Sequence, residues 1–274
     1  MRTLFWGVAV ITLAAALTFL TLPILAIFIR VPPGHLYGSG VALDALRVTA
    51  WTSLAANALF LVVGTPAAYL LATRRFPGRA AVLTVCELPL VLPPVVAGVG
   101  LLVAFGRVGI LGDELRALGW SIPFTRLAVV LAVAFVAGPV YLRSAIAAFQ
   151  AVDRGHLEAA RTLGAGPARV FTRVAVPMAA AGLASGWAMA FARGLGEFGA
   201  TLIFAGSVRG STQTLTLAVY AQLGAFDLNA ALAMGGLLVV FAAAVLIAVK
   251  LVSAWTHRSS TSISTSPAAG FPSG

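Results

Sequence analysis

The chain has 274 residues, of which 60% are hydrophobic and only 9% are charged. About a quarter of the residues of an ordinary soluble domain are charged, so this composition excludes a typical water-soluble protein and indicates a membrane protein. The formal net charge of +10 would also suit a nucleic-acid-binding protein. The basic residues, however, lie between long apolar segments and form no single basic face. We therefore expect a lipid bilayer, and no nucleic acid, as the surroundings of most of the chain.

Six apolar stretches are long enough to cross a membrane, since a crossing helix needs about 20 mostly apolar residues. They are residues 4–29, 49–72, 80–105, 127–149, 178–204 and 228–252. The alternating pattern of about ten residues that is typical of membrane β-strands is absent. The sequence thus predicts an all-α, polytopic bundle of six transmembrane helices.

The two ends of the chain carry separate predictions. Arg2 followed by an apolar run is typical of a signal peptide, but the run is long and no clear small-residue cleavage site precedes a polar segment. We expect residues 1–30 to be retained as a first transmembrane helix, with cleavage as the alternative. Residues 49–252 would form the main transmembrane domain. The Ser/Thr-rich residues 259–274 lack an apolar face and are predicted to be disordered.

The third stretch contains Pro89, Pro93 and Pro94. Each proline removes a backbone donor, so this helix should be broken or kinked. A broken helix is tolerated at membrane depth only where protein or a watery cavity satisfies the freed carbonyls. We therefore expect this element to lie inside the bundle rather than against lipid.

The positions of Lys and Arg predict the orientation. With the N-terminus inside, the inner segments hold eleven basic residues and the outer segments hold six, while Arg193 lies within a helix. This excess places the loop between the fourth and fifth stretches, and both termini, in the cytoplasm. The inner set is Arg2, Arg74, Arg75, Arg79, Arg143, Arg154, Arg161, Arg169, Arg173, Lys250 and Arg258, and the outer set is Arg30, Arg47, Arg107, Arg116, Arg126 and Arg209.

That cytoplasmic loop, residues 150–177, contains Glu158-Ala159-Ala160, then three residues, Gly164, nine residues and Val174-Ala175-Val176-Pro177. A short helix is expected over 156–163, started by Asp153 or Gly155 and stopped by Gly164. Glu158 would lie in its first turn, where the helix dipole favours an anion. The two alanines leave room for another protein surface, and Gly164 allows a sharp turn.

This spacing resembles the Glu-Ala-Ala-x3-Gly-x9-Ile-x-Leu-Pro signature of ABC importer permeases, with Val174 and Val176 in place of Ile and Leu. The resemblance implies the type I ABC importer permease fold and a coupling helix that docks on a separate ATPase. Its residues here would be Glu158, Ala159, Ala160, Gly164 and Pro177. An ordinary loop helix with chance spacing is the alternative. The chain has no Gly-x4-Gly-Lys-Ser/Thr phosphate loop, so we expect it not to be an enzyme itself.

Further stretches narrow the substrate by resemblance. Phe76-Pro77-Gly78-Arg79, LPLVLPPVVAG (88–98) and ARTLGAG (160–166) resemble molybdate permease subunits, and FARGLGEFGATLIFAG (191–206) is similar to both molybdate and sulfate permeases. The chain departs from these permeases in its added first stretch and at Ser207-Val208-Arg209. The resemblance implies a homodimeric importer of molybdate or tungstate in the cytoplasmic (inner) membrane. Two ATPase subunits would drive it, and a periplasmic or surface-anchored oxyanion-binding protein would supply it.

Three alternatives to this function remain. A sulfate or thiosulfate permease is the main one. A gradient-driven secondary transporter would show inverted repeats or paired broken helices, whereas only one strongly proline-broken helix is visible. An intramembrane enzyme would need His-Glu-x-x-His or Gly-x-Ser-x-Gly, and neither occurs.

The candidate pathway or gate residues are Pro93, Pro94, Arg193, Glu197, Gly199 and Thr201. Arg193 and Glu197 are four residues apart on a predicted helix and can pair. A neutralised arginine is a poor anion ligand, so a structural ion pair is favoured over substrate contact. The small residues could offer backbone and hydroxyl groups to an oxyanion, or simply allow close helix packing. We expect no cofactor and no metal, because the single cysteine, Cys86, and the three histidines are isolated.

Overall fold

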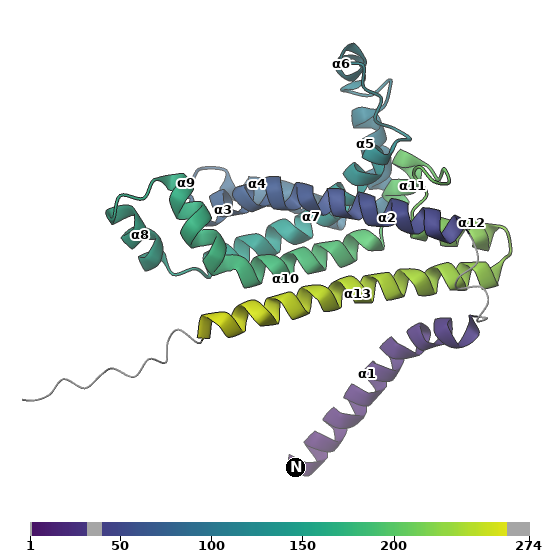
Figure 1. Ribbon diagram of the computed structural model, residues 1–274, viewed down its shortest axis with the longest axis horizontal. Helices are drawn as coiled ribbons and strands as arrows, with labels where there is room; N and C mark the ends of the chain where they lie inside the picture. The colour runs from purple at the N-terminus through teal and green to yellow at the C-terminus, as the bar shows by residue number, and fades with distance from the viewer. Residues whose placement is uncertain (1, 32–39, 262–274) are drawn as a thin grey trace, which may run out of the picture. The chain divides into compact units, whose positions relative to one another are not determined.

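The computed structural model describes residues 2–31 and 40–261, which are almost entirely helical (Figure 1). They form two compact units, Met1–Thr49 with Ser207–Phe241, and Ala50–Gly206 with Ala242–Gly274. The predicted all-α class is confirmed. The elements are α1 (Arg2–Arg30), α2 (Gly40–Leu59), η1 (Phe60–Gly64), α3 (Thr65–Thr73), α4 (Arg79–Val91), α5 (Pro94–Phe105), α6 (Gly112–Ala117), α7 (Arg126–Gln150), α8 (Arg154–Thr162), α9 (Pro167–Val170), η2 (Phe171–Ala175), α10 (Val176–Leu195), α11 (Gly199–Ala205), α12 (Leu215–Gly224) and α13 (Leu228–Thr261).

Within the described residues, five helical spans are long and apolar enough to cross a membrane. Leu4–Arg30, Gly40–Thr73, Arg126–Gln150, Pro167–Leu195 and Leu228–Val249 are these spans. A sixth is obtained if α4 and α5, bent by 116° at their break, count as one. These six elements correspond to the six predicted stretches. The short apolar helix α12 was not predicted, and all but the first three residues of the tail expected at 259–274 lie outside the described residues, since α13 ends at Thr261.

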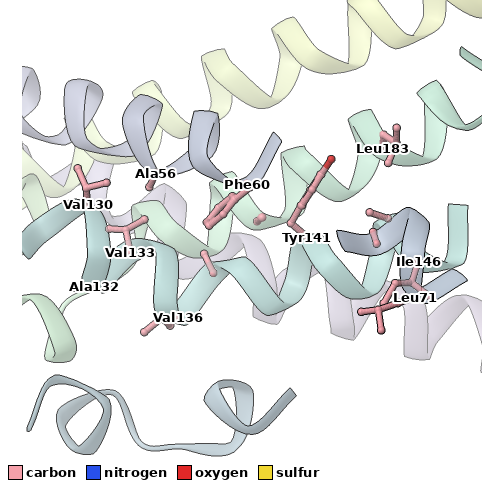
Figure 2. Close-up of a cluster of buried hydrophobic side chains, with 14 of the residues drawn as sticks. Ala56, Phe60, Leu71, Val130, Ala132, Val133, Val136, Tyr141, Ile146 and Leu183 are labelled. Atoms are coloured by element: carbon pink, nitrogen blue, oxygen red, sulfur yellow. The ribbon is translucent and has the colours of Figure 1, made fainter. Parts of the chain in front are cut away.

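Helix α7 is the centre of the larger unit and packs against α3, α4, α5, α10 and α11. Figure 2 shows its buried side chains, among them Val133 and Tyr141, close to Phe60. The rings of Tyr141 and Phe60 stack with centroids 6.2 Å apart. The Tyr141 hydroxyl shares a hydrogen bond of 2.5 Å with Thr65 Oγ1, so this buried polar group is satisfied.

Helices α7 and α10 lie side by side (Figure 1) and approach closely through small residues. A Cβ atom built onto any of three α10 glycines would come within 2.8 Å of an α7 side-chain atom. The pairs are Gly182 with Ala148, Gly186 with Ser144 and Gly194 with Val133. Lipid tails provide no hydrophobic force between helices, so such close packing is what holds membrane helices together. Gly194 therefore has a packing role, like Gly182 and Gly186.

Two π-helical turns interrupt the spans, and each stands just before a proline. The turn η1 precedes Pro66, and η2 precedes Pro177. A proline ring clashes with the carbonyl four residues earlier, and a wider turn removes this clash while the helix continues. Both spans therefore stay helical through their prolines.

The predicted break of the third stretch is present. Leu92 and Pro93 are extended between α4 and α5, and the carbonyls of Pro89 and Leu90 lose their helical donors because Pro93 and Pro94 have no N–H. The expected burial inside the bundle is not found within this chain, however. Helix α4 has no buried residue, and residues 91–96 are exposed. The physical reason is that the contact of α11 with Pro94 and Val95, made at Gly199, leaves the side chains of residues 91–96 open.

The smaller unit has a core of its own, formed by Ala45, Leu215, Ala218 and Met234. The backbone N–H of Leu215 donates to Thr49 Oγ1 at 2.8 Å, which ties the start of α12 to α2. The same unit contains α1, a single helix over the predicted first transmembrane segment, whose described side chains are nearly all exposed.

The close packing of α7 and α10 predicts a strong effect of one added side chain. In Gly186→Leu the new side chain must enter the space of Ser144, and overpacking of this kind costs about 1–3 kcal/mol. We expect a lower melting temperature of the purified protein. The control is Gly7→Leu, since an added Cβ there meets no atom within 4 Å. Equal melting of the Gly186 variant and the wild type would contradict glycine-dependent packing.

Candidate functional site

The predicted short loop helix exists as α8, but its bounds differ from expectation. It begins at Arg154 because Asp153 caps it: the Asp153 Oδ1 atom accepts the N–H of Gly155 at 2.9 Å. The predicted start was residue 156. Glu158 therefore lies in the second turn, and the argument that the helix dipole stabilises its charge is wrong.

The end of α8 at Gly164 is as predicted. Gly164 has φ +81°, a left-handed conformation that side chains with a Cβ rarely adopt. Its N–H donates to the Arg161 carbonyl at 3.0 Å, and the N–H of Ala165 donates to the Ala160 carbonyl at 3.0 Å. These two bonds form a Schellman motif, which fixes the direction in which the chain leaves the helix.

The two faces of α8 differ. Leu157 is buried and Ala160 is half-buried against the core of the larger unit. Ala159 and Thr162 are exposed, and Leu163 is 88% exposed. Of the two alanines expected to admit another protein surface, only Ala159 is open to one, because Ala160 already contacts this chain. Leu163 was missed from the sequence; the signal is a large apolar residue directly before the glycine that ends a polar helix.

Pro177 lies at the second position of α10 and is exposed. It follows the turn η2, which continues α9 into α10 without a break. Only four residues, 163–166, separate α8 from this long span. The loop motif is thus joined directly to a transmembrane helix.

The second candidate region is the gap between α10 and α11. A continuous helix over 178–204 was expected, but α10 ends at Leu195. Gly194 and Gly196 weaken the helix at this point. The Glu197 carboxylate then starts the next helix, since its Oε1 atom accepts the N–H of Ala200 at 2.9 Å.

The predicted ion pair of Arg193 and Glu197 is present. Arg193 Nη1 lies 3.2 Å from Glu197 Oε2. The Glu197 side chain is only 1% exposed, whereas that of Arg193 is 39% exposed. The carboxylate therefore has a partner at each oxygen, and its charge neutralises the guanidinium. The arrangement fits a structural pair that holds the gap between the two helices.

Two candidate pathway residues from distant segments meet here. A Cβ atom at Gly199 would lie 2.9 Å from Pro94 Cβ, and one at Gly98 would lie 2.9 Å from the Ala200 backbone. Helices α5 and α11 are therefore in contact at backbone distance. Thr201 is fully buried, and its Oγ1 atom has no hydrogen-bond partner among the residues that the structure describes.

Among the described residues, α4–α5 is the one proline-broken pair, as the sequence indicated, and α10–α11 is interrupted as well, without a proline. The number of broken helices is consequently no argument against a secondary transporter. In the described part of the chain, no group of three or more His, Cys, Asp or Glu side chains is placed to hold a metal ion.

Residues 64–258 match the protein family described as "Binding-protein-dependent transport system inner membrane component". The chain is 42% identical over 238 residues to the "Molybdenum transport system permease protein ModB" of Mycobacterium tuberculosis, covering 86% of this chain and 90% of that protein. It is 37% identical over 196 residues to "Sulfate permease 2, chloroplastic" of Chlamydomonas reinhardtii, covering 72% and 53%. In fold it is similar to a chain of the "Crystal structure of bacterial alginate ABC transporter in complex with alginate pentasaccharide-bound periplasmic protein", with TM-score 0.66, 17% identity and 96% of both chains covered.

The buried Glu197 predicts unequal effects of removing either partner of the ion pair. Arg193→Met leaves an uncompensated buried carboxylate, which costs about 3–5 kcal/mol in a fully buried pair; the exposure of Arg193 points to the low end. Glu197→Gln keeps an acceptor for the Ala200 N–H and should be milder. The double variant should melt above Arg193→Met, as measured on the purified proteins. If it melts no higher, the pair does not hold this gap.

Proposed function

Since this chain belongs to the family of binding-protein-dependent transport system inner membrane components, we propose that it is the permease subunit of an ATP-driven importer of molybdate or tungstate. It is a multi-pass membrane protein of this family, and its fold is that of an ABC importer permease. Residues 1–30 would be its first helix and 49–252 its transport domain. Residues 150–177 would be the coupling loop, and 259–274 a disordered tail.

The observation that carries the coupling role is the geometry of α8. It is a short helix beyond the ends of α7 and α10, with an exposed small residue, Ala159, and an exposed apolar one, Leu163. An exposed apolar side chain beside a small residue suits insertion into a groove of a partner. Glu158 and Gly164 would belong to the same contact, and Pro177 would join it to α10. The ATPase would be a separate subunit, because this chain has no phosphate loop.

The substrate class rests on relatives. The protein from Mycobacterium tuberculosis is named for molybdenum transport and matches over most of both chains. The Chlamydomonas protein is named a sulfate permease and matches at lower identity, so sulfate is the second candidate. Both substrates are tetrahedral dianions, for which desolvation is costly. A pathway of backbone groups and small residues would hold such an ion weakly enough to release it.

A homodimer is supported by the exposed break between α4 and α5. Backbone carbonyls without donors are tolerated at membrane depth only against protein or a watery cavity. The described residues leave this break exposed, and a second copy, enclosing a shared pathway, would cover it. A periplasmic or surface-anchored oxyanion-binding protein would deliver the ion on the side opposite α8. The solved alginate transporter is described in complex with a periplasmic protein of its own.

The function is tested by co-purifying the chain with its ATPase and reconstituting both in vesicles with the binding protein. We expect ATP-dependent uptake of molybdate that tungstate competes for and sulfate barely affects. Ala159→Trp and Leu163→Asp should each lower ligand-stimulated ATP hydrolysis by about tenfold or more, because loss of a central interface contact costs about 2 kcal/mol. Gly164→Val should be weaker, at a backbone cost of about 1 kcal/mol or more.

The matched control is Ala168→Trp, at an exposed position of the same loop outside α8. It should leave hydrolysis and uptake close to those of the wild type. If Ala159→Trp and Leu163→Asp assemble and transport normally, α8 is not the point of coupling. If the vesicles take up sulfate in preference to molybdate, sulfate is the transported ion.

The orientation has its own test. We expect a cysteine at Ala168 to face the cytoplasm and one at the fully exposed Val108 to face outward, because of the excess of arginine on the side of α8. In a Cys86→Ala background, an impermeant thiol reagent added to intact cells should label only Val108→Cys. Permeabilised cells should show labelling at both positions. Labelling of Ala168→Cys in intact cells would show that the orientation is opposite to the predicted one.

A further inference from the structure

A cavity of about 350 Å³ lies beside α8 in the larger unit, a volume within the range of small-molecule pockets. The last residues of α3 and α7, the turn from α3 to α4 and one face of α8 form its wall. Most of the charged side chains in this wall are basic. They are one carboxylate, Glu158, and five arginines, Arg74, Arg75, Arg79, Arg154 and Arg161.

The positive charge of this cavity is not neutralised within the chain. In the part of the chain that the structure describes, no carboxylate lies within 4.0 Å of any of the five arginines, Glu158 included. Arg79 is held in place by its Nε atom, which donates to the Leu71 carbonyl near the end of α3 at 2.8 Å. Several guanidinium groups around one cavity create a site for an anion with several oxygens.

The location of the cavity identifies the source of such an anion. Thr73 and Gln150, both in its wall, end the candidate spans Gly40–Thr73 and Arg126–Gln150. The ends of membrane-crossing helices lie at the level of the lipid headgroups, and basic pockets between such helices bind phosphate-bearing headgroups. The planar fork of arginine matches the geometry of phosphate oxygens. We propose that this cavity binds a phosphate group, supplied by the headgroup of an anionic phospholipid.

The cavity lies on a different face of α8 from Ala159 and Leu163, and Glu158 belongs both to its wall and to the proposed ATPase contact. Arg154, Leu157, Glu158 and Arg161 share the face of α8 that lines the cavity, because positions three, four and seven residues apart lie on one side of a helix. Ala159 and Leu163 point elsewhere and are exposed. A bound phosphate would tie α8 to the α3–α4 turn whatever ion the permease carries, so the inference does not depend on the transported substrate.

The test measures lipid binding to the full chain, purified in mild detergent, by native mass spectrometry. The probes are phosphatidylglycerol, phosphatidylcholine and, in a separate titration, inorganic phosphate. We expect the wild type to retain phosphatidylglycerol in preference to phosphatidylcholine. Arg75→Gln with Arg154→Gln should weaken this binding by about tenfold or more, since each basic residue near a membrane surface contributes about 1 kcal/mol. Arg169→Gln with Arg173→Gln, two exposed arginines of the same loop outside the cavity, should not.

Each outcome decides the proposal. Selective loss of phosphatidylglycerol in the cavity variant supports the lipid headgroup. If the wild type shows no lipid preference but binds inorganic phosphate, and the cavity variant loses this binding, the cavity is a phosphate site and a lipid headgroup is not the source of the phosphate. Equal lipid loss in both double variants, or no loss in either, overturns the site. If the cavity variant fails to fold, Arg75→Lys with Arg154→Lys is used, which keeps the positive charges and removes the planar guanidinium groups. Unchanged phosphatidylglycerol binding by this variant would contradict recognition of phosphate by the arginine geometry.

Discussion

An unpaired peptide N–H or C=O in hydrocarbon costs several kcal/mol, and this constraint determines the form of the chain. Every span is helical because only a helix satisfies its own backbone. Pro23, Pro89 and Pro139 remain inside α-helices, whereas at other prolines the helix changes in one of two ways. At Pro66 and Pro177 a π-helical turn absorbs the misfit and the span continues. At Pro93 and Pro94 the helix stops and restarts at a bend of 116°, which leaves carbonyls exposed in the single chain.

Much of this fold could be predicted from the sequence. A helix must reach a minimum length to cross the membrane, so the six apolar stretches could be predicted. The proline break could be predicted because proline lacks a backbone donor. Gly164 could be predicted because a glycine that ends a polar helix is there for its positive φ. The end of α10 at Leu195 could not. Residues 178–204 are mostly apolar on both sides of Arg193 and Glu197, so the stretch is long enough to be predicted as one helix. The next helix starts where the Glu197 carboxylate bonds forward to Ala200 as well as back to Arg193.

The orientation of α8 was also beyond the sequence. Ala159 and Ala160 are adjacent identical residues, and only the burial of Leu157 against the larger unit decides which of them is open. Likewise, the start of α8 depends on whether Asp153 or Gly155 caps it, and both were acceptable in sequence. The burial of the proline break failed as a prediction for a different reason: the prolines show that the freed carbonyls need a partner, but not where that partner lies. Helix ends and breaks that depend on neighbouring residues could be predicted from the sequence, whereas the burial of a side chain against a distant segment could not.

The continuity from η2 into α10 has a structural consequence. The span Pro167–Leu195 has 29 residues and is about 40 Å long. At one end, four residues, 163–166, separate it from α8, whose C-terminus is closed by two hydrogen bonds. The other end holds Arg193, bonded to Glu197, whose carboxylate starts α11 against α5 at the proline break. The span is helical throughout, and Gly182 and Gly186 rest on α7. One continuous element therefore extends from the loop of α8 to the two interrupted helices.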